Sequence, residues 1–277
     1  MRKSFNQLRK VFDQGFTVKQ LALDSRLSIY VMYKRFSKTL SEVTCKKRII
    51  RIRGQKLILL IDAQWQYFDH KLWTLYFVSI KAVGSEFVTV LDPVLKEGKE
   101  SMLNWKQIID NLPQGIRKRI IAVVSDGIRG IETVADDNDW VIQRCHFHLL
   151  SLLQKMRGKR ASTPGRLLRE DLYSSVKLTL SEKSGSELDM ICRRIADLAK
   201  NPICPKRMRM AARDFLRRIH EFRSYIDHPD LKLPTTVNVM ESINSFTRRK
   251  SKTINNPQSW HKWAIACARF KSKFTCK

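Results

Sequence analysis

The sequence contains two short runs of almost wholly apolar residues, LILLID and RIIAVVS, and each of them leads to an aspartate. The first run ends at Asp62, and the second continues directly into Asp126. Continuous apolar runs of this length are typical of strands that are buried on both faces of a sheet. Helices must cover both faces of such a sheet, so the two runs predict an α/β fold.

The other expected elements extend this sheet. We expect three strands in a meander, over residues 57–62, 73–83 and 86–91, with Gly84 and Ser85 in a tight turn. Next we expect a helix over 101–110, a strand over 119–125, a short helix over 128–135, a strand over 140–143 and a helix from Phe147 onward. Three antiparallel strands followed by helix-linked parallel strands make a mixed sheet with flanking helices.

The amino-terminal residues predict a helix-turn-helix. Thr17 and Ser28 are good N-caps for the segments VKQLALDSRL and IYVMYKRFSKTL. The second segment combines an apolar stripe with basic residues: the stripe is Ile29, Met32, Tyr33 and Phe36, and the basic residues are Lys34, Arg35 and Lys38. A helix pair whose second member is basic is the layout of a DNA reader. Small helical pairs are common, so the charge of the chain has to support this interpretation.

We divide the chain into five segments on these patterns. Residues 1–44 form the predicted helix-turn-helix, and 45–56, with the stretch CKKRIIRIRGQK, form a basic linker. Residues 57–154 form the first part of the sheet domain. Residues 155–233 are basic with helical patterning and predict an all-helical insertion. Residues 234–277 hold one more helix, VNVMESINSFTRRK, and a basic tail.

The charge of the chain points to an acidic polymer as its partner. Lys and Arg total 53 against 26 Asp and Glu, which gives a formal net charge of +27 and a pI near 10.2. Charge of this size repels itself in a compact fold, and binding of a polyanion relieves that repulsion. Nucleic acid is the commonest such polymer, so we expect double-stranded DNA as the partner. A merely solubilising surface explains the sign of the charge poorly.

An anionic membrane is the rival partner, and the sequence argues against it. No apolar run approaches the ~18 residues of a spanning helix. The basic start, MRKSFNQLRK, lacks the apolar core of a signal peptide. The six cysteines are scattered without a C-x-x-C pair, which predicts reduced thiols. We therefore expect a cytoplasmic protein.

Three acidic residues are candidates for catalysis. Carboxylates beside a dry sheet are unfavourable unless a cation binds them, and Mg²⁺ prefers oxygen ligands. If the strands that lead to Asp62 and Asp126 are neighbours, their side chains converge on one site. The third candidate, Glu241, lies on a predicted helix with two distinct faces. The apolar face is Val239, Ile243 and Phe246, and the polar face is Asn238, Glu241, Ser245 and Arg248. The alternative is that the aspartates cap strand ends and that the glutamate lies on a solvated face.

A C-x-x-H pair, Cys145 and His148, lies in the stretch QRCHFHLL at a strand-to-helix junction. Such a pair can be half of a tetrahedral zinc site. No second pair with ligand spacing follows, so we expect no structural zinc. A nucleophilic cysteine would need a base and an orienting group that the sequence does not identify. We interpret the stretch, His146 included, as a packing and hydrogen-bonding cluster.

In combination, these motifs resemble a known family. Asp62, the stretch SDG at Ser125, the C-x-x-H stretch and the N-x-x-E of TTVNVMES resemble the DDE transposases of the IS256 and Mutator type. The stretches LDPVLKEGKESMLNW and LPTTVNVMES are most similar to the zinc-binding variant of that family. The resemblance covers roughly residues 57–263. One departure is that the zinc-binding variants usually begin with a cysteine-rich ribbon, which has no counterpart before the helix-turn-helix. The chain is therefore also interpretable as a shortened copy, a fragment or a product of a mis-set start.

The resemblance implies a ribonuclease-H-like catalytic domain with a helical insertion. It makes Asp62, Asp126 and Glu241 the catalytic triad that binds Mg²⁺, with Mn²⁺ as a substitute, and it leaves Cys145 and His148 as a signature outside the metal site. The implied activity is cleavage at transposon ends and transfer of the freed 3′-hydroxyl into target DNA. An inactive DNA-binding copy and a nuclease of the same fold are the alternatives.

Partners and location follow from the charge, the helix patterns and the resemblance together. We expect DNA contacts from basic residues of two helices, namely Lys34, Arg35, Lys38, Arg248, Arg249 and Lys250. Synapsis of two DNA ends implies a homodimer or larger assembly. The expected location is the nucleoid of a bacterial cytoplasm.

Overall fold

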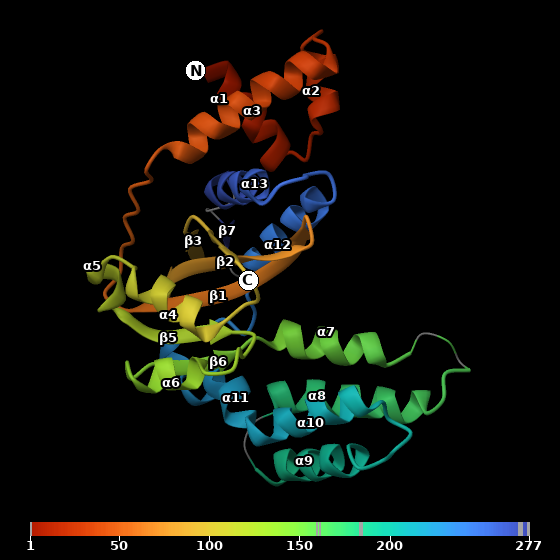
Figure 1. The fold of residues 1–277 in the computed structure, drawn as a ribbon. Coiled ribbons are helices and arrows are strands. Elements are labelled where there is room, and N and C mark those ends of the chain that lie inside the picture. The colour runs from red at the N-terminus through yellow and green to blue at the C-terminus, as the bar shows by residue number, and fades with distance from the viewer. Residues whose placement is uncertain (1, 159, 161, 183–184, 271–273, 276–277) are drawn as a thin grey trace. The chain divides into compact units, whose positions relative to one another are not determined.

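The computed structural model describes residues 2–158, 160, 162–182, 185–270 and 274–275 (Figure 1). The chain divides into two compact units. The first unit is Met1–Ile120 with Asn238–Lys277, and the second is Ile121–Val237. Antiparallel strands in the first unit, a parallel pair in the second and many helices make the fold mixed α/β, as the apolar runs predicted.

The first unit begins with three helices: α1 (Arg2–Phe12), α2 (Val18–Asp24) and α3 (Ile29–Cys45). Both predicted N-caps are confirmed, because the side chain of Thr17 accepts from the Gln20 N–H and that of Ser28 from the Val31 N–H. The expected apolar stripe of α3 is buried only at Met32 and Phe36. Ile29 and Tyr33 of the stripe are 44% and 54% exposed.

A sheet of antiparallel strands follows in this unit. Its strands are β1 (Leu57–Phe68), β2 (Lys71–Ala82), β3 (Phe87–Val90), β4 (Val94–Glu97) and β7 (Phe274–Thr275). β1 pairs with β2, which pairs with both β3 and β4, and β3 pairs with β7. The helix α4 (Met102–Asp110), capped by Ser101, and the short α5 (Gln114–Arg117) come next in the chain.

The prediction that the first strand ends at Asp62 was wrong. β1 continues to Phe68, and Asp62 lies in its interior opposite Phe77 of β2. The strand continues because β1 and β2 form a long hairpin, whose two-residue turn has φ of 46° at Asp69 and 63° at His70. Positive φ at both turn residues matches the twist of the strands on either side.

Two helices complete the first unit: α12 (Asn238–Ser251) and α13 (Pro257–Phe270). The segment that we expected to be a basic tail is largely α13, which packs beside α1 and α3 (Figure 1). Aromatic rings make this contact: Trp263 lies 5.3 Å from Phe12 and 5.2 Å from Phe36 between ring centroids. Trp260 is fully buried and donates from Nε1 to the Thr247 carbonyl of α12 at 3.2 Å.

The second unit begins with a β–α–β segment. β5 (Ile120–Ser125), α6 (Ile131–Asp136) and β6 (Val141–Arg144) follow in order, and the two strands are parallel. α6 begins three residues later than expected, because Gly130 adopts a φ of 97° and forms its N-cap. Such a conformation favours glycine.

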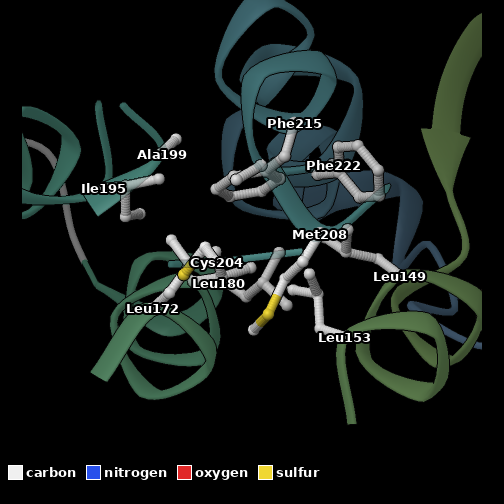
Figure 2. Packing of buried hydrophobic residues seen from close by; sticks show 12 residues of the cluster. Leu149, Leu153, Leu172, Leu180, Ile195, Ala199, Cys204, Met208, Phe215 and Phe222 are labelled. Atoms are coloured by element: carbon white, nitrogen blue, oxygen red, sulfur yellow. The ribbon is translucent and has the colours of Figure 1, made fainter. Parts of the chain in front are cut away.

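The rest of the second unit is helical, as predicted for residues 155–233. Its elements are α7 (His146–Met156), α8 (Arg166–Ser181), α9 (Ser186–Leu198), α10 (Lys206–Arg217), α11 (Ile219–Asp227) and the 3₁₀ helix η1 (Pro229–Leu231). Figure 2 shows their common core, in which Met208 and Phe215 of α10 meet Leu153 of α7 and Leu172 of α8. All four side chains are fully buried.

Candidate functional site

Asp62 is a buried carboxylate in the first unit. Its relative exposure is 3%, although its neighbours in β1 are apolar. Two donors hold its oxygens: the Ala63 N–H bonds Oδ1 at 2.8 Å, and Nδ2 of Asn244 bonds Oδ2 at 2.6 Å. These two hydrogen bonds fix the orientation of the buried carboxylate.

Glu241 lies close to this aspartate. It is in the first turn of α12, and a carboxylate oxygen of Glu241 lies within 4.8 Å of one of Asp62. The apolar face predicted for this helix is confirmed, since Val239, Ile243 and Phe246 are 4%, 0% and 9% exposed. Burial of that face turns the Glu241 side of α12 toward β1. The structure therefore brings together two of the three predicted acids.

A row of polar contacts seats α12 on β1. Asp62, Gln64 and Gln66 alternate along the strand, so their side chains share one face. Each of the three makes a side-chain hydrogen bond to α12. Asp62 is bonded to Asn244 at 2.6 Å, and the Gln64 amide is bonded to the Thr247 hydroxyl at 2.6 Å. Gln66 is bonded to the Ser251 hydroxyl at 3.3 Å. We call this row the polar ladder. It fixes the register of α12 on β1.

Asn244 is a site residue that we did not identify from the sequence. We placed Ser245 on the polar face with Glu241, but Ser245 is exposed, while Asn244 is 4% exposed and faces Asp62. Its spacing of three residues from Glu241 was the available signal. Its Oδ1 is buried and accepts no hydrogen bond within the part of the chain that the structure describes.

The oxygen atoms around Asp62 suit a hard divalent cation. Two carboxylates within 4.8 Å of one another repel unless a cation or proton lies between them. Mg²⁺ and Ca²⁺ take carboxylate and amide oxygens as ligands, and the buried Oδ1 of Asn244 is another such oxygen. The pair Asp62 and Glu241 could therefore hold a metal ion.

Asp126 lies in the second unit, directly after β5, and its side chain is exposed. Its neighbour Gly127 has a φ of 91° and donates its N–H to the Ser125 hydroxyl at 3.1 Å. A Cβ at Gly127 would lie 2.3 Å from Cζ of Arg144. The SDG stretch thus requires glycine both for its backbone conformation and for the close approach of this arginine.

Arg144 is a second residue that sequence reasoning missed. It is 6% exposed and donates from Nη2 to the Gly127 carbonyl at 3.3 Å. Nε lies 2.7 Å from a Glu221 carboxylate oxygen, and Nη1 lies 3.2 Å from one of Asp214. A buried guanidinium requires such partners. Arg144 thereby connects the loop after Asp126 to α10 and α11, a tertiary contact without a local sequence signal.

The C-x-x-H stretch packs within the second unit. Cys145 is 1% exposed, and its N–H donates to the Ser125 carbonyl at 2.7 Å. His146 Nε2 bonds the Phe222 carbonyl at 2.7 Å, and burial lowers the pKa of this imidazole despite that bond. His148 lies in the first turn of α7, and its ring centroid is 5.7 Å from that of Phe147. For Cys145 and His146, these contacts agree with a packing and hydrogen-bonding role.

The expected DNA contacts differ in accessibility. Lys34, Arg35 and Lys38 of α3 are exposed, and so are Arg248 and Arg249 of α12. Lys250 is half-buried, with Nζ 4.5 Å from the Trp263 ring centroid and 5.9 Å from that of Phe246. Burial lowers the pKa of this ammonium, and the neighbouring Arg249 lowers it further. Arg249 and Lys250 line a cavity of about 830 Å³ next to α1.

Among the helices of the described residues, none is both long and apolar enough to cross a membrane.

Comparison of the sequence with protein-family models gives no match, and comparison with curated proteins gives none either.

Proposed function

We propose that the chain is a DNA transposase that cuts and joins DNA with bound divalent metal ions. The observation that carries the proposal is the pair formed by Asp62 and Glu241, which are far apart in the sequence and have carboxylate oxygens within 4.8 Å. Paired acidic residues on a buried strand and an adjacent helix provide the hard oxygen ligands of phosphodiester chemistry. The family resemblance and the net charge of +27 support DNA as the substrate.

We propose that Asp126 is the third acid of this site. The Leu57 N–H donates to the Arg119 carbonyl at 2.8 Å, at the starts of β1 and β5. In a parallel pair this bond makes Leu57 the partner of Ile120. Asp62 comes five residues after Leu57, and Asp126 comes six residues after Ile120, so the two acids have similar positions along their segments. A ribonuclease-H-like architecture is what the family resemblance implies for these strands.

Asp62, Asp126 and Glu241 would hold Mg²⁺, or Mn²⁺ in its place. When bound, the ions would neutralise charge on the phosphodiester and clamp its attacking and leaving oxygens. Asn244 would orient Asp62 through its bond to Oδ2. The polar ladder would keep Glu241 in register with Asp62, which is the positioning that such chemistry requires.

DNA recognition is assigned to α2 and α3 as a helix-turn-helix. The exposed residues Lys34, Arg35 and Lys38 would contact phosphates or base edges, while Met32 and Phe36 pack into the unit. Most of the excess of lysine and arginine falls in the first unit, which holds these helices. A charged surface of this kind binds duplex DNA through release of counterions.

The test is a cleavage and strand-transfer assay with purified protein, Mg²⁺ or Mn²⁺, and labelled DNA that carries the ends flanking its own gene. We expect nicked and joined products from the wild type. Asp62→Asn, Asp126→Asn and Glu241→Gln should each lose both products yet still bind DNA. Asp69→Asn is the matched control, since it removes an exposed charge from the turn of the same hairpin and should remain active.

Each other outcome of this assay contradicts the proposal in a distinct way. Tight binding without nicking by the wild type indicates an inactive DNA-binding copy. Nicking without joined product indicates a nuclease. Full cleavage by any one of the three variants removes that residue from the site.

A further inference from the structure

The segment between α3 and β1 is unusually basic. Residues 46–56 contain six basic residues and no acidic one. We call this segment the basic arm; its basic residues are Lys46, Lys47, Arg48, Arg51, Arg53 and Lys56. The arm is extended, without helix or strand, and it ends six residues before Asp62.

Exposure alternates along the arm. Lys47, Ile49, Arg51 and Arg53 are exposed, while Arg48, Ile50 and Ile52 between them are half-buried. Alternation is expected where an extended chain lies along a surface, because successive side chains point to opposite sides. The arm therefore has an inner row that contacts the protein and an outer row that faces away. Neighbours in the outer row are roughly 6.6 Å apart, twice the rise of an extended residue.

The inner side of the arm is fixed to the sheet. Nη1 of Arg48 donates to the Val90 carbonyl at 2.8 Å. Nη1 of Arg119 donates to the carbonyls of Ile52 at 3.2 Å and of Gly54 at 2.6 Å. Gly54 has a φ of 107°, and a Cβ there would lie 2.8 Å from Cβ of Ala82. The backbone that carries the outer row is thus anchored before any partner binds, which reduces the entropy lost on binding.

The cations of the outer row are exposed. No salt bridge among the described residues involves Lys47, Arg51 or Arg53. Cations that serve only solubility need no such fixed row. Ile49 lies in the same row and is 82% exposed, so a large apolar side chain also faces outward at this point. A row of exposed cations on an anchored backbone, with no ion pair to the described residues, matches a partner that carries repeated negative charges.

We propose that the basic arm is a DNA-binding element, in which Lys47, Arg51 and Arg53 contact phosphates of a duplex that runs from α3 toward Asp62. Duplex DNA presents one phosphate every ~3.4 Å along each strand, so an extended row of cations can track its backbone. The identity of the anion rests on the proposed function, whereas the row and its anchoring do not. Contacts to phosphates position a duplex without reading its sequence. The arm would align the DNA between the reader helix and the acidic site.

The experiment measures binding of a labelled duplex by fluorescence anisotropy over a series of salt concentrations. The test protein carries Lys47→Gln, Arg51→Gln and Arg53→Gln together. Each lost phosphate contact lowers the slope of log affinity against log salt by about 0.9, so the triple variant should lose about 2.7 from the slope. Replacement of Lys47 by Arg and of both arginines by Lys should restore the wild-type slope, because a phosphate contact needs the charge alone.

The matched control removes the same charge elsewhere. Lys106→Gln, Lys118→Gln and Lys177→Gln replace exposed lysines outside the arm and should leave the slope nearly unchanged. A test variant that keeps the wild-type slope, or loses no more than the control, overturns the arm proposal while DNA binding and the proposed function stand. A wild type without salt-dependent DNA binding overturns both. Circular dichroism of each variant checks that it is folded.

Discussion

Gly127→Ala tests the contact between the loop after Asp126 and Arg144. The glycine has a φ of 91°, and an added Cβ would lie 2.3, 2.6 and 2.7 Å from Cζ, Nη2 and Nε of the arginine. Atoms this close must move. The guanidinium has little room to do so, because it is buried and held by ion pairs to Glu221 and Asp214.

The expected loss of stability has two parts. A non-glycine residue at positive φ costs about 1–2 kcal/mol. Displacement of a buried arginine from its acidic partners costs about 3–5 kcal/mol when a pair is fully broken. The Arg144–Glu221 pair is buried on both sides, with side-chain exposures of 7% and 9%. With the pair fully broken, we therefore expect Gly127→Ala to lower the free energy of unfolding by roughly 4–7 kcal/mol.

Gly98→Ala separates the two parts. Gly98 has a similar φ of 98°, but an added Cβ would meet no atom within 4 Å. This control should lose only the backbone part, about 1–2 kcal/mol. Urea unfolding followed by far-ultraviolet circular dichroism measures both variants. In an Arg144→Met background, Gly127→Ala should cost no more than Gly98→Ala, which gives a coupling energy by double-mutant cycle. Equal losses for Gly127→Ala and Gly98→Ala in the wild-type background would refute the contact.

Three further predictions concern the cores and the metal. Phe215→Ala should lower the free energy of unfolding, measured by urea titration, by about 3–5 kcal/mol, because the Phe215 side chain is 0% exposed. Met210→Ala, on the exposed face of the same helix, is the control and should change that free energy by less than about 0.5 kcal/mol. Asn244→Leu should weaken Mn²⁺ binding in calorimetric titrations by roughly 10–100-fold, since it removes the amide that orients the buried aspartate, and unchanged affinity would contradict that role. Burial lowers the pKa of His146 and of His261 below 6.5, so near that pH the unfolded chain binds more protons than the folded chain. The free energy of unfolding should therefore fall as the pH drops below about 6.5. Substitution of both histidines by Gln should flatten this pH dependence, as measured by urea titrations across the range.

Much of the fold could be predicted because local patterns determine it. The apolar runs that begin β1 and form β5 are strands, and the caps at Thr17 and Ser28 begin helices as predicted. The second half of β1 was missed because AQWQYF mixes polar and aromatic residues and becomes a strand only through its pairing with β2. α13 was missed although Pro257 at its start and the helix-forming residues Ala264, Ala266 and Ala268 were available signals.

The candidate site divides in the same way. Glu241 could be singled out because a two-faced helix leaves it opposite the apolar residues that pack inward. Asn244 was missed because two adjacent positions, 244 and 245, fit the polar face almost equally well, and only the docking of the helix selects one. Arg144 was missed because its acidic partners lie on elements far along the chain, and no local pattern predicts such a network.

The polar ladder has a further consequence for the Asp62–Glu241 pair. Two residues of β1 advance by about 6.6 Å, while three or four residues of a helix advance by about 4.5–6 Å, so the two repeats stay nearly in step over the length of the ladder. Apolar surfaces slide over one another at small cost, but a shift of α12 by one residue would break hydrogen bonds at Gln64, Gln66 and Asp62 together. Because Glu241 lies three residues before Asn244, its distance from Asp62 is set by this register. A site that needs two carboxylates at a fixed separation is therefore better supported by a polar helix interface than by an apolar one.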